Sequence, residues 1–320
     1  MKRKLVYFLP ALFIFSAFFG PESRANTPDE GYKMRKIVID PGHGGKDAGC
    51  MSNGYKEKDL VLSVALRVGE MIRESLPDVE VIYTRKTDVF VELLERGNIA
   101  NRARADLFLS IHVDAVGQAS PNGSSSWVMG LSREESNLQL AMRENSVITY
   151  EDDYQTKYEG FDPKDPASYI KFALMQSGYF DQSIRLASIL QRRYKQHTTI
   201  NTDRGVKQAG FLVLHRTTMP SVLTEIGFLT NASDRAFMTS RAGKEKVARA
   251  IFEGICEYKD LVEGNSAVAQ STATTNDNSA AAEPARTAAE NSAPASVSAQ
   301  STTVFRIQVS ASRTRVDRSR

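Results

Sequence analysis

Four side chains suited to metal binding and acid–base chemistry stand beside strand-like or helical segments of the chain. His43 follows an apolar run in the stretch IVIDPGHGG, and His112 closes the run DLFLSIHVDA. Glu225 lies inside the apolar run SVLTEIGFLTN, and Glu57 begins a helical pattern. Two imidazoles and one carboxylate form a catalytic zinc set that leaves the fourth position for water. A second carboxylate could then take the proton of that water and deliver it to a leaving nitrogen, and Glu225 fits this role.

The strands that carry these residues are expected to bring them together. If the strands at His43, His112 and Glu225 are parallel, all three side chains emerge at the carboxyl edge of one sheet. This edge is where open α/β sheets place their sites. A carboxylate inside an apolar strand is costly unless it is paired, protonated or near a metal, which makes Glu225 a candidate functional residue.

Each of these signals has a structural alternative. A histidine at a strand end is more often a structural residue than a ligand, and Glu57 could simply cap the helix that it begins. His197, in a polar stretch, and His215, at a predicted strand end, are assigned structural roles. The spacing of the four candidates is not a local motif, so the residue pattern alone leaves the metal site and the structural interpretation open.

The glycines around His43 raise the alternative of a phosphate-binding loop. The stretch PGHGGKDAG fits neither G-x-G-x-x-G nor G-x-x-x-x-G-K-[ST], and no helical pattern starts directly after it. The glycines are instead interpreted as giving a ligand room to approach His43.

Residues 36–262 are predicted to form a single three-layer α/β domain with a mostly parallel, twisted sheet flanked by helices. Apolar stripes at helical spacing predict helices over 58–76, 181–196 and 244–259. Short apolar runs predict strands over residues 36–40, 79–84, 107–113, 211–215 and 221–226.

Residues 131–180 form a predicted helical insertion between the third and fourth of these strands. The segment holds nine acidic and five basic residues. Ser132 and Glu135 fit a capping box, which predicts a helix from there to about Val147. A further helical segment is expected over 169–175. A long insertion in a compact domain is usually either functional or poorly ordered.

The two ends of the chain lie outside this domain. A basic start, an apolar stretch and small residues before Asn26 predict a signal peptide over residues 1–25, and the apolar stretch is short for a membrane anchor. The protein is therefore expected to be exported, with 26–35 as a lead-in. Residues 263–303 are predicted to be a disordered linker, and 304–320 the first strand of an incomplete module.

Charge and cysteine content narrow the function classes. The formal charge of +3 is carried by residues 1–25, so the mature chain is close to neutral and nucleic acid is not an expected partner. Cys50 and Cys256 are the only cysteines, and both are expected to be free thiols.

Several stretches together resemble the zinc-dependent N-acetylmuramoyl-L-alanine amidases, in particular the cell-separation type of the bacterial periplasm. The resemblance spans residues 36 to about 260 and rests on IVIDPGHGGKDAG, EKDLVLSVALRV, YTRKTDVFVELLERGNIANRARADLFLSIHVDA, RGVKQAGFLVL and MPSVLTEIGFLTN. It implies that His43, Glu57 and His112 bind one Zn²⁺ per chain, and that Glu225 is the catalytic carboxylate. The implied substrate is peptidoglycan, cut at the amide between N-acetylmuramic acid and L-alanine.

The same resemblance gives the insertion and the tail an expected meaning. Amidases of this type often carry an inserted helical arm over the zinc, which an activator protein displaces. Glu144 would then be the inhibitory residue that fills the open zinc position, although an ordinary exposed helix acid is the competing interpretation. The C-terminal strand resembles the start of a sporulation-related peptidoglycan-binding repeat.

The expected function is therefore a periplasmic hydrolase of cell-wall remodelling and daughter-cell separation, autoinhibited by its insertion and without a stable membrane anchor. Two alternatives are another zinc peptidase or amidohydrolase of the cell wall, and a catalytically silent peptidoglycan-binding scaffold. The newly formed terminus distinguishes the first alternative, because only the amidase releases a free L-alanine amine. The second alternative predicts that Glu225→Gln changes nothing measurable.

Overall fold

The structure of the protein is a computed structural model, which describes residues 31–132, 134–173, 178–199 and 202–265. The predicted signal peptide, most of the predicted linker and the C-terminal strand over 304–320 lie outside the described residues. Within the described part, no helix is both long and apolar enough to cross a membrane.

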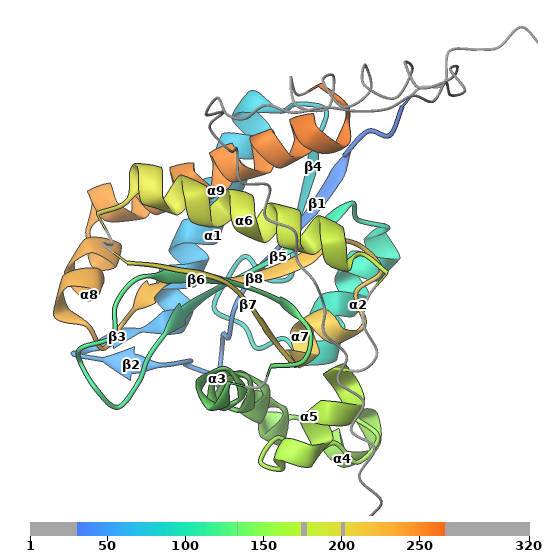
Figure 1. The fold of residues 1–320 in the computed structure, drawn as a ribbon, viewed down its shortest axis with the longest axis vertical. Coiled ribbons are helices and arrows are strands. Elements are labelled where there is room, and N and C mark those ends of the chain that lie inside the picture. The colour runs from blue at the N-terminus through green and yellow to red at the C-terminus, as the bar shows by residue number, and fades with distance from the viewer. Residues whose placement is uncertain (1–30, 133, 174–177, 200–201, 266–320) are drawn as a thin grey trace, which may run out of the picture. The chain divides into compact units, whose positions relative to one another are not determined.

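One mixed six-stranded sheet forms the centre of the domain (Figure 1). In spatial order its strands are β4 (Glu80–Tyr83), β1 (Lys36–Pro41), β5 (Leu107–Asp114), β8 (Ser221–Phe228), β6 (Ser124–Met129) and β7 (Asp203–Ala209). The first four of these strands are parallel to one another. β6 is antiparallel to β8, and β7 is parallel to β6. The carboxyl ends of β1, β5 and β8 therefore share one edge.

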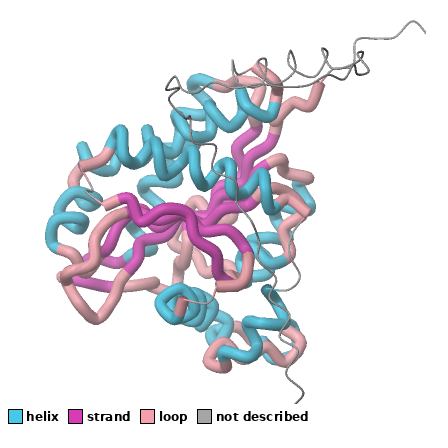
Figure 2. The backbone as a smooth tube through the Cα atoms, viewed as in Figure 1, coloured by secondary structure: helices cyan, strands magenta, loops and turns pink. Residues whose placement is uncertain are grey.

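Helices cover both faces of this sheet, as Figure 2 shows. One face carries α1 (Glu57–Ser75), α6 (Phe180–His197) and α9 (Arg241–Val262), with α8 (Ala232–Thr239) packed beside α9. The other face carries α2 (Leu93–Ala103) and α7 (Leu212–His215). A short hairpin of β2 (Met51–Ser52) and β3 (Tyr55–Lys56) precedes α1. The three-layer α/β architecture predicted from the sequence is confirmed.

Two apolar clusters hold these layers together, one on each side of the sheet. The predicted stripe of α1 is buried in the first cluster, as are the stripes of α6 and α9. The α1 residues that pack there are Leu60, Val61, Val64, Val68, Met71 and Ile72. Burial of these stripes, rather than helix propensity, accounts for most of the stability of such helices.

One predicted strand, residues 211–215, is wrong, and two strands of the central sheet, besides the short β2–β3 hairpin, were not predicted. Residues 212–215 form α7, because a short apolar run that is buried on all sides does not distinguish a helix from a strand. β6 (SSSWVM) and β7 (DRGVKQA) are too polar to show the apolar alternation of a strand. Their pairing with β8 and with each other makes them strands.

The insertion consists of α3 (Glu135–Asn145), the 3-10 helix η1 (Ser146–Tyr150), α4 (Tyr154–Lys157) and α5 (Pro166–Ala173). The predicted capping box does not form: Ser132 Oγ accepts a hydrogen bond from the backbone N–H of Glu134, and α3 begins after it. Residues 169–173 of the helix expected over 169–175 lie in α5, which begins earlier, at a proline suited to a first helical position, and residues 174–175 lie outside the described residues. Leu140 and Ala141 of α3 pack against the sheet in the second apolar cluster.

Candidate metal centre

His43 lies in the loop after β1 and is held in an unusual backbone conformation. Its φ angle is +58°, which is uncommon for a residue with a side chain. Its Nδ1 lies 2.7 Å from Asp47 Oδ2, so the carboxylate orients the ring and leaves Nε2 facing the sheet edge. This is the arrangement of a metal-ligating histidine, whose second ring nitrogen is held by a carboxylate.

Two buried arginines hold the carbonyl oxygens of this loop. Arg96 donates to the carbonyl oxygens of Pro41 and His43, and its charge is balanced by Asp40 at 2.8 Å. Arg85 donates to the carbonyl oxygens of Pro41 and Gly42. Because each guanidinium presents several donors in a fixed plane, the two side chains fix the path of the loop.

Glu57 and His112 approach His43 from two other elements. Glu57 is the first residue of α1, yet its side chain turns away from its own helix and accepts hydrogen bonds from the backbone N–H groups of Cys50 and Val113. Glu57 Oε2 lies 3.1 Å from His43 Nε2, and Glu57 Oε1 lies 3.1 Å from His112 Nδ1. These contacts rule out simple helix capping as the role of Glu57.

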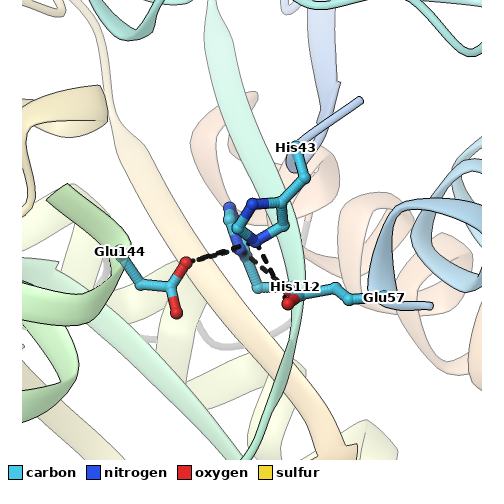
Figure 3. A group of neighbouring side chains, drawn as sticks. All are labelled: His43, Glu57, His112 and Glu144. Carbon is cyan, nitrogen blue, oxygen red and sulfur yellow. Dashed lines mark hydrogen bonds and ion pairs between the residues drawn. The ribbon is translucent and has the colours of Figure 1, made fainter. Parts of the chain in front are cut away.

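Glu144 joins this group from α3 of the insertion (Figure 3). Its Oε2 lies 3.3 Å from His43 Nε2 and 3.2 Å from His112 Nδ1. The side chain is buried, so the interpretation of Glu144 as an ordinary exposed acid does not hold. Ligand atoms of His43, Glu57, His112 and Glu144 all lie within 4.8 Å of one another.

The donor atoms of this group fit a divalent metal ion. Among the described residues, His43 Nε2 and Glu144 Oε2 are buried and make no hydrogen bond, although they lie in ion-pair contact with each other. Burial lowers the pKa of His43, but the charge of Glu57, the hydrogen bond to Asp47 and the close contact with Glu144 outweigh it and hold this pKa well above its usual value. Two imidazole nitrogens with carboxylate oxygens are the ligands that Zn²⁺ prefers.

Glu225 lies next to this group, on the strand beside His112. Residues His112 and Glu225 are direct neighbours in the parallel register of β5 and β8. The Glu225 side chain is fully buried, and neither carboxylate oxygen has a hydrogen-bond partner in the part of the chain that the structure describes. Burial, followed by the charges of Asp114 and Glu144, holds the pKa of Glu225 well above its usual value. Such a carboxyl group is suited to proton transfer.

The glycines of the loop serve the protein's own side chains. A Cβ atom on Gly42 would lie 2.4 Å from the His112 ring, and one on Gly49 would lie 2.6 Å from Glu57 Oε2. Only glycine therefore lets the loop pass so close to two of the grouped side chains. The earlier interpretation, that the glycines make room for a ligand at His43, is replaced by this one.

The remaining histidines and the cysteines lie outside the group. His197 pairs with Glu253 across α6 and α9, at 2.7 Å, in agreement with a structural role. His215 ends α7, and not a strand as predicted. Cys50 and Cys256 are free thiols, as expected.

Sequence reasoning missed the residues that position the group. Asp47 stands four residues after His43, a spacing that could have signalled a partner for its ring. Arg143, which donates to Asp114 Oδ1 and to the carbonyl oxygen of Ala115, had no comparable signal. Its position depends on how α3 docks against the sheet.

Comparison with known proteins identifies the family of the chain. The family described as N-acetylmuramoyl-L-alanine amidase matches residues 37–257. The amidase AmiA of Escherichia coli K12 is 33% identical over 225 residues, which are 70% of this chain and 76% of AmiA. The amidase LytC of Bacillus subtilis 168 is 36% identical over 69% of this chain, although the match covers only 35% of LytC.

Solved structures show the same fold. The amidase AmiC2 of Nostoc punctiforme superimposes with a TM-score of 0.52 at 29% identity, over 71% of this chain and 98% of that structure. An amidase from Clostridium difficile 630 gives a TM-score of 0.53 at 24% identity. The grouped histidines and carboxylates thus lie in a domain whose sequence and fold both match one family of peptidoglycan hydrolases, and the chain belongs to the N-acetylmuramoyl-L-alanine amidases.

Proposed function

We propose that His43, Glu57 and His112 hold one Zn²⁺ and that Glu225 is the catalytic carboxylate of this amidase. The observation that carries the proposal is the convergence of two imidazoles and one carboxylate beside a buried carboxyl group that has no hydrogen-bond partner among the described residues. The substrate bond is the amide between N-acetylmuramic acid and the first L-alanine of the stem peptide. The cellular role is cell-wall remodelling during daughter-cell separation.

Hydrolysis of the amide would use both the metal and side chains of the protein. When bound, the metal would polarise the scissile carbonyl and lower the pKa of a water molecule. Glu225 takes a proton from the attacking water and delivers it to the leaving nitrogen of L-alanine. Asp47 holds the His43 ring, and the two buried arginines Arg85 and Arg96 keep its loop in place.

Glu144 gives the insertion an inhibitory role. A catalytic zinc site keeps a position open for water or substrate, whereas Glu144 supplies a fourth ligand and closes this group. Arg143 strengthens the closure through its bonds to Asp114 and Ala115. Asn145 does so through bonds to the backbone of Gly210 and Leu212. A protein activator that displaces α3 would open the site.

The presence of Glu144 as a fourth ligand also favours one competing function. A four-ligand set without an open position is typical of structural zinc sites, so the chain could be a silent wall-binding protein. The two functions differ in what happens when Glu144 is removed. In a silent protein the loss of a ligand only weakens metal binding, and in an inhibited enzyme it also produces activity.

The test compares full-length, zinc-loaded wild type with Glu144→Ala on purified sacculi, and measures peptides with a free N-terminal L-alanine. We expect release by Glu144→Ala well above the wild-type level, and its loss when Glu225→Gln is added. Glu135→Ala, at an exposed acid of the same helix, is the matched control and stays at the wild-type level. A different new terminus would indicate a peptidase, and no release with zinc bound would indicate the silent protein.

The proposal also includes export of the protein to the periplasm. Residues 1–25 act as a cleaved signal peptide and deliver the protein to the periplasm, where its substrate lies. N-terminal sequencing of the protein recovered from a periplasmic fraction should begin at Asn26. Recovery of a chain that begins at Met1 would contradict this part of the proposal.

A further inference from the structure

The sheet face that carries Glu225 continues under the insertion onto β6 and β7. In the antiparallel register of β6 and β8, Ser125 faces Glu225 and Trp127 faces Leu223. In the parallel register of β6 and β7, Trp127 faces Lys207. Side chains of directly paired residues lie on the same face of a sheet. Trp127 and Lys207 therefore share a face with the proposed catalytic carboxylate Glu225. Both are level with Leu223, which stands two residues before Glu225 on β8.

Trp127 and Lys207 form a pair on this face. Lys207 Nζ lies 5.3 Å from the centroid of the Trp127 ring, and Trp127 is only 3% exposed. Trp127 Nε1 donates to Ser125 Oγ at 2.9 Å, and Ser125 is paired with Glu225 in the strand register. The strands thus place a cation against a buried aromatic ring on the sheet face that carries Glu225.

Lys207 has a polar partner but no carboxylate partner among the residues that the structure describes. The partner is Asn137 of α3, whose Oδ1 accepts a hydrogen bond from Lys207 Nζ at 3.4 Å. The described partners of this partly buried ammonium group are a neutral amide and an aromatic ring, so no carboxylate balances its charge. An anionic ligand would compensate that charge better than the amide does.

The spacing along α3 relates this pair to the metal position. Asn137 and Glu144 stand seven residues apart, and both are buried on the face of α3 that covers the sheet. Two helical turns separate them by about 10 Å at 1.5 Å per residue. One face of α3 therefore places a carboxylate at the metal ligands and an amide oxygen at Lys207.

We propose that Trp127 and Lys207 form a subsite for a free carboxylate of the stem peptide, and that α3 covers this subsite with Asn137 while Glu144 covers the metal position. An extended peptide spans about 10 Å in three residues, so the carboxylate belongs to the second or third residue beyond the scissile amide. The glycan cannot supply this anion, because the lactyl carboxyl group of muramic acid is consumed in that amide. The inference rests on the proposed function and adds a source of substrate selectivity.

The test measures peptide binding to the full-length, zinc-loaded variant Glu144→Ala/Glu225→Gln, which leaves the ligand intact. The probes are N-acetylmuramoyl tripeptides in which the carboxylates of the second and third residues are free or amidated in turn. We expect Lys207→Met to weaken binding of the free-carboxylate peptide about tenfold or more and to leave the fully amidated peptide unchanged. Lys207→Arg should keep most of the affinity, because it keeps the charge.

Lys246→Met, at an exposed lysine of α9, is the matched control and should change neither affinity. The subsite would be overturned if Lys207→Met and its parent bound the free-carboxylate peptide with equal affinity. It would also be overturned if Lys207→Met lost the same affinity for the free-carboxylate and the amidated peptide. Release of free N-terminal L-alanine from sacculi by Glu144→Ala is a separate readout. Loss of this release would count against the proposed function, whereas release without a Lys207 dependence of binding would count against the subsite alone, so the two failures are distinguishable.

Discussion

At the scale of single residues, His43 depends on a carboxylate that does not itself face the proposed metal position. Asp47 Oδ2 lies 2.7 Å from His43 Nδ1, and both side chains are buried. The contact selects the ring orientation that points Nε2 toward Glu57 and His112. A partner of this kind tunes metal affinity because it raises the basicity of the ring and restricts its rotation.

Replacing Asp47 with alanine is therefore expected to weaken zinc binding about 10- to 100-fold. The measurement is competition with a chromogenic chelator on the full-length protein. Asp59→Ala, at an exposed acid on α1, serves as the control and should leave the affinity unchanged. An unchanged affinity in Asp47→Ala would mean that His43 is held by its loop alone.

At the scale of elements, α3 is a helix that is held by polar anchors at its carboxyl end. Arg143 bonds to the end of β5, and Asn145 bonds to the segment that leads into α7. The apolar face of α3 contributes mainly Leu140 and Ala141 to the packing against the sheet. Few buried apolar groups and several replaceable hydrogen bonds are the properties of a segment that can open locally.

Loss of one anchor should loosen this helix without unfolding the domain. Asn145→Ala removes the bonds to Gly210 O and Leu212 N, and we expect faster amide hydrogen exchange in α3. Exchange in the central strands β1, β5 and β8 should stay at the wild-type rate. Gln139→Ala, at an exposed position of α3, should have no effect. Faster exchange throughout the sheet would instead show that α3 is an integral part of the core.

At the scale of the whole molecule, the grouped ligands join four separate parts of the described domain. His43 follows β1, Glu57 starts α1, His112 is in β5 and Glu144 is in the insertion. These positions are far apart in the chain, so the site exists only in the folded state. A metal that binds the folded state and not the unfolded state stabilises the fold by mass action.

Zinc should accordingly raise the melting temperature of the wild-type protein. At a free metal concentration of about a thousand times Kd, the added stability is about 4 kcal/mol, or a shift of about 10 °C for a domain of this size. Scanning calorimetry with zinc and with a chelator measures the shift. The double variant His43→Ala/His112→Ala should show none, and an equal shift in that variant would place the metal elsewhere.

Much of the fold and of the candidate site could be predicted where a candidate residue lies within, or at the end of, the apolar pattern that marks its helix or strand. Glu57 begins the apolar stripe of α1, and His112 closes the apolar run of β5, so the sequence by itself indicated both the element and the site. Glu225 was conspicuous because a carboxylate is rare in an apolar strand. These patterns are local, so they can be recognised in the sequence without knowing which distant segments pack together.

Only the tertiary structure decided the features that depend on contacts between distant segments. Glu144 is one acid among nine in residues 131–180, and nothing in its neighbourhood distinguishes it. Its position follows from the docking of α3 over the sheet. Likewise, β6 and β7 became strands through pairing, which brought Lys207 beside Trp127. Hydrophobic period and residue type determine elements, whereas the free energy of packing one element on another determines which side chains meet.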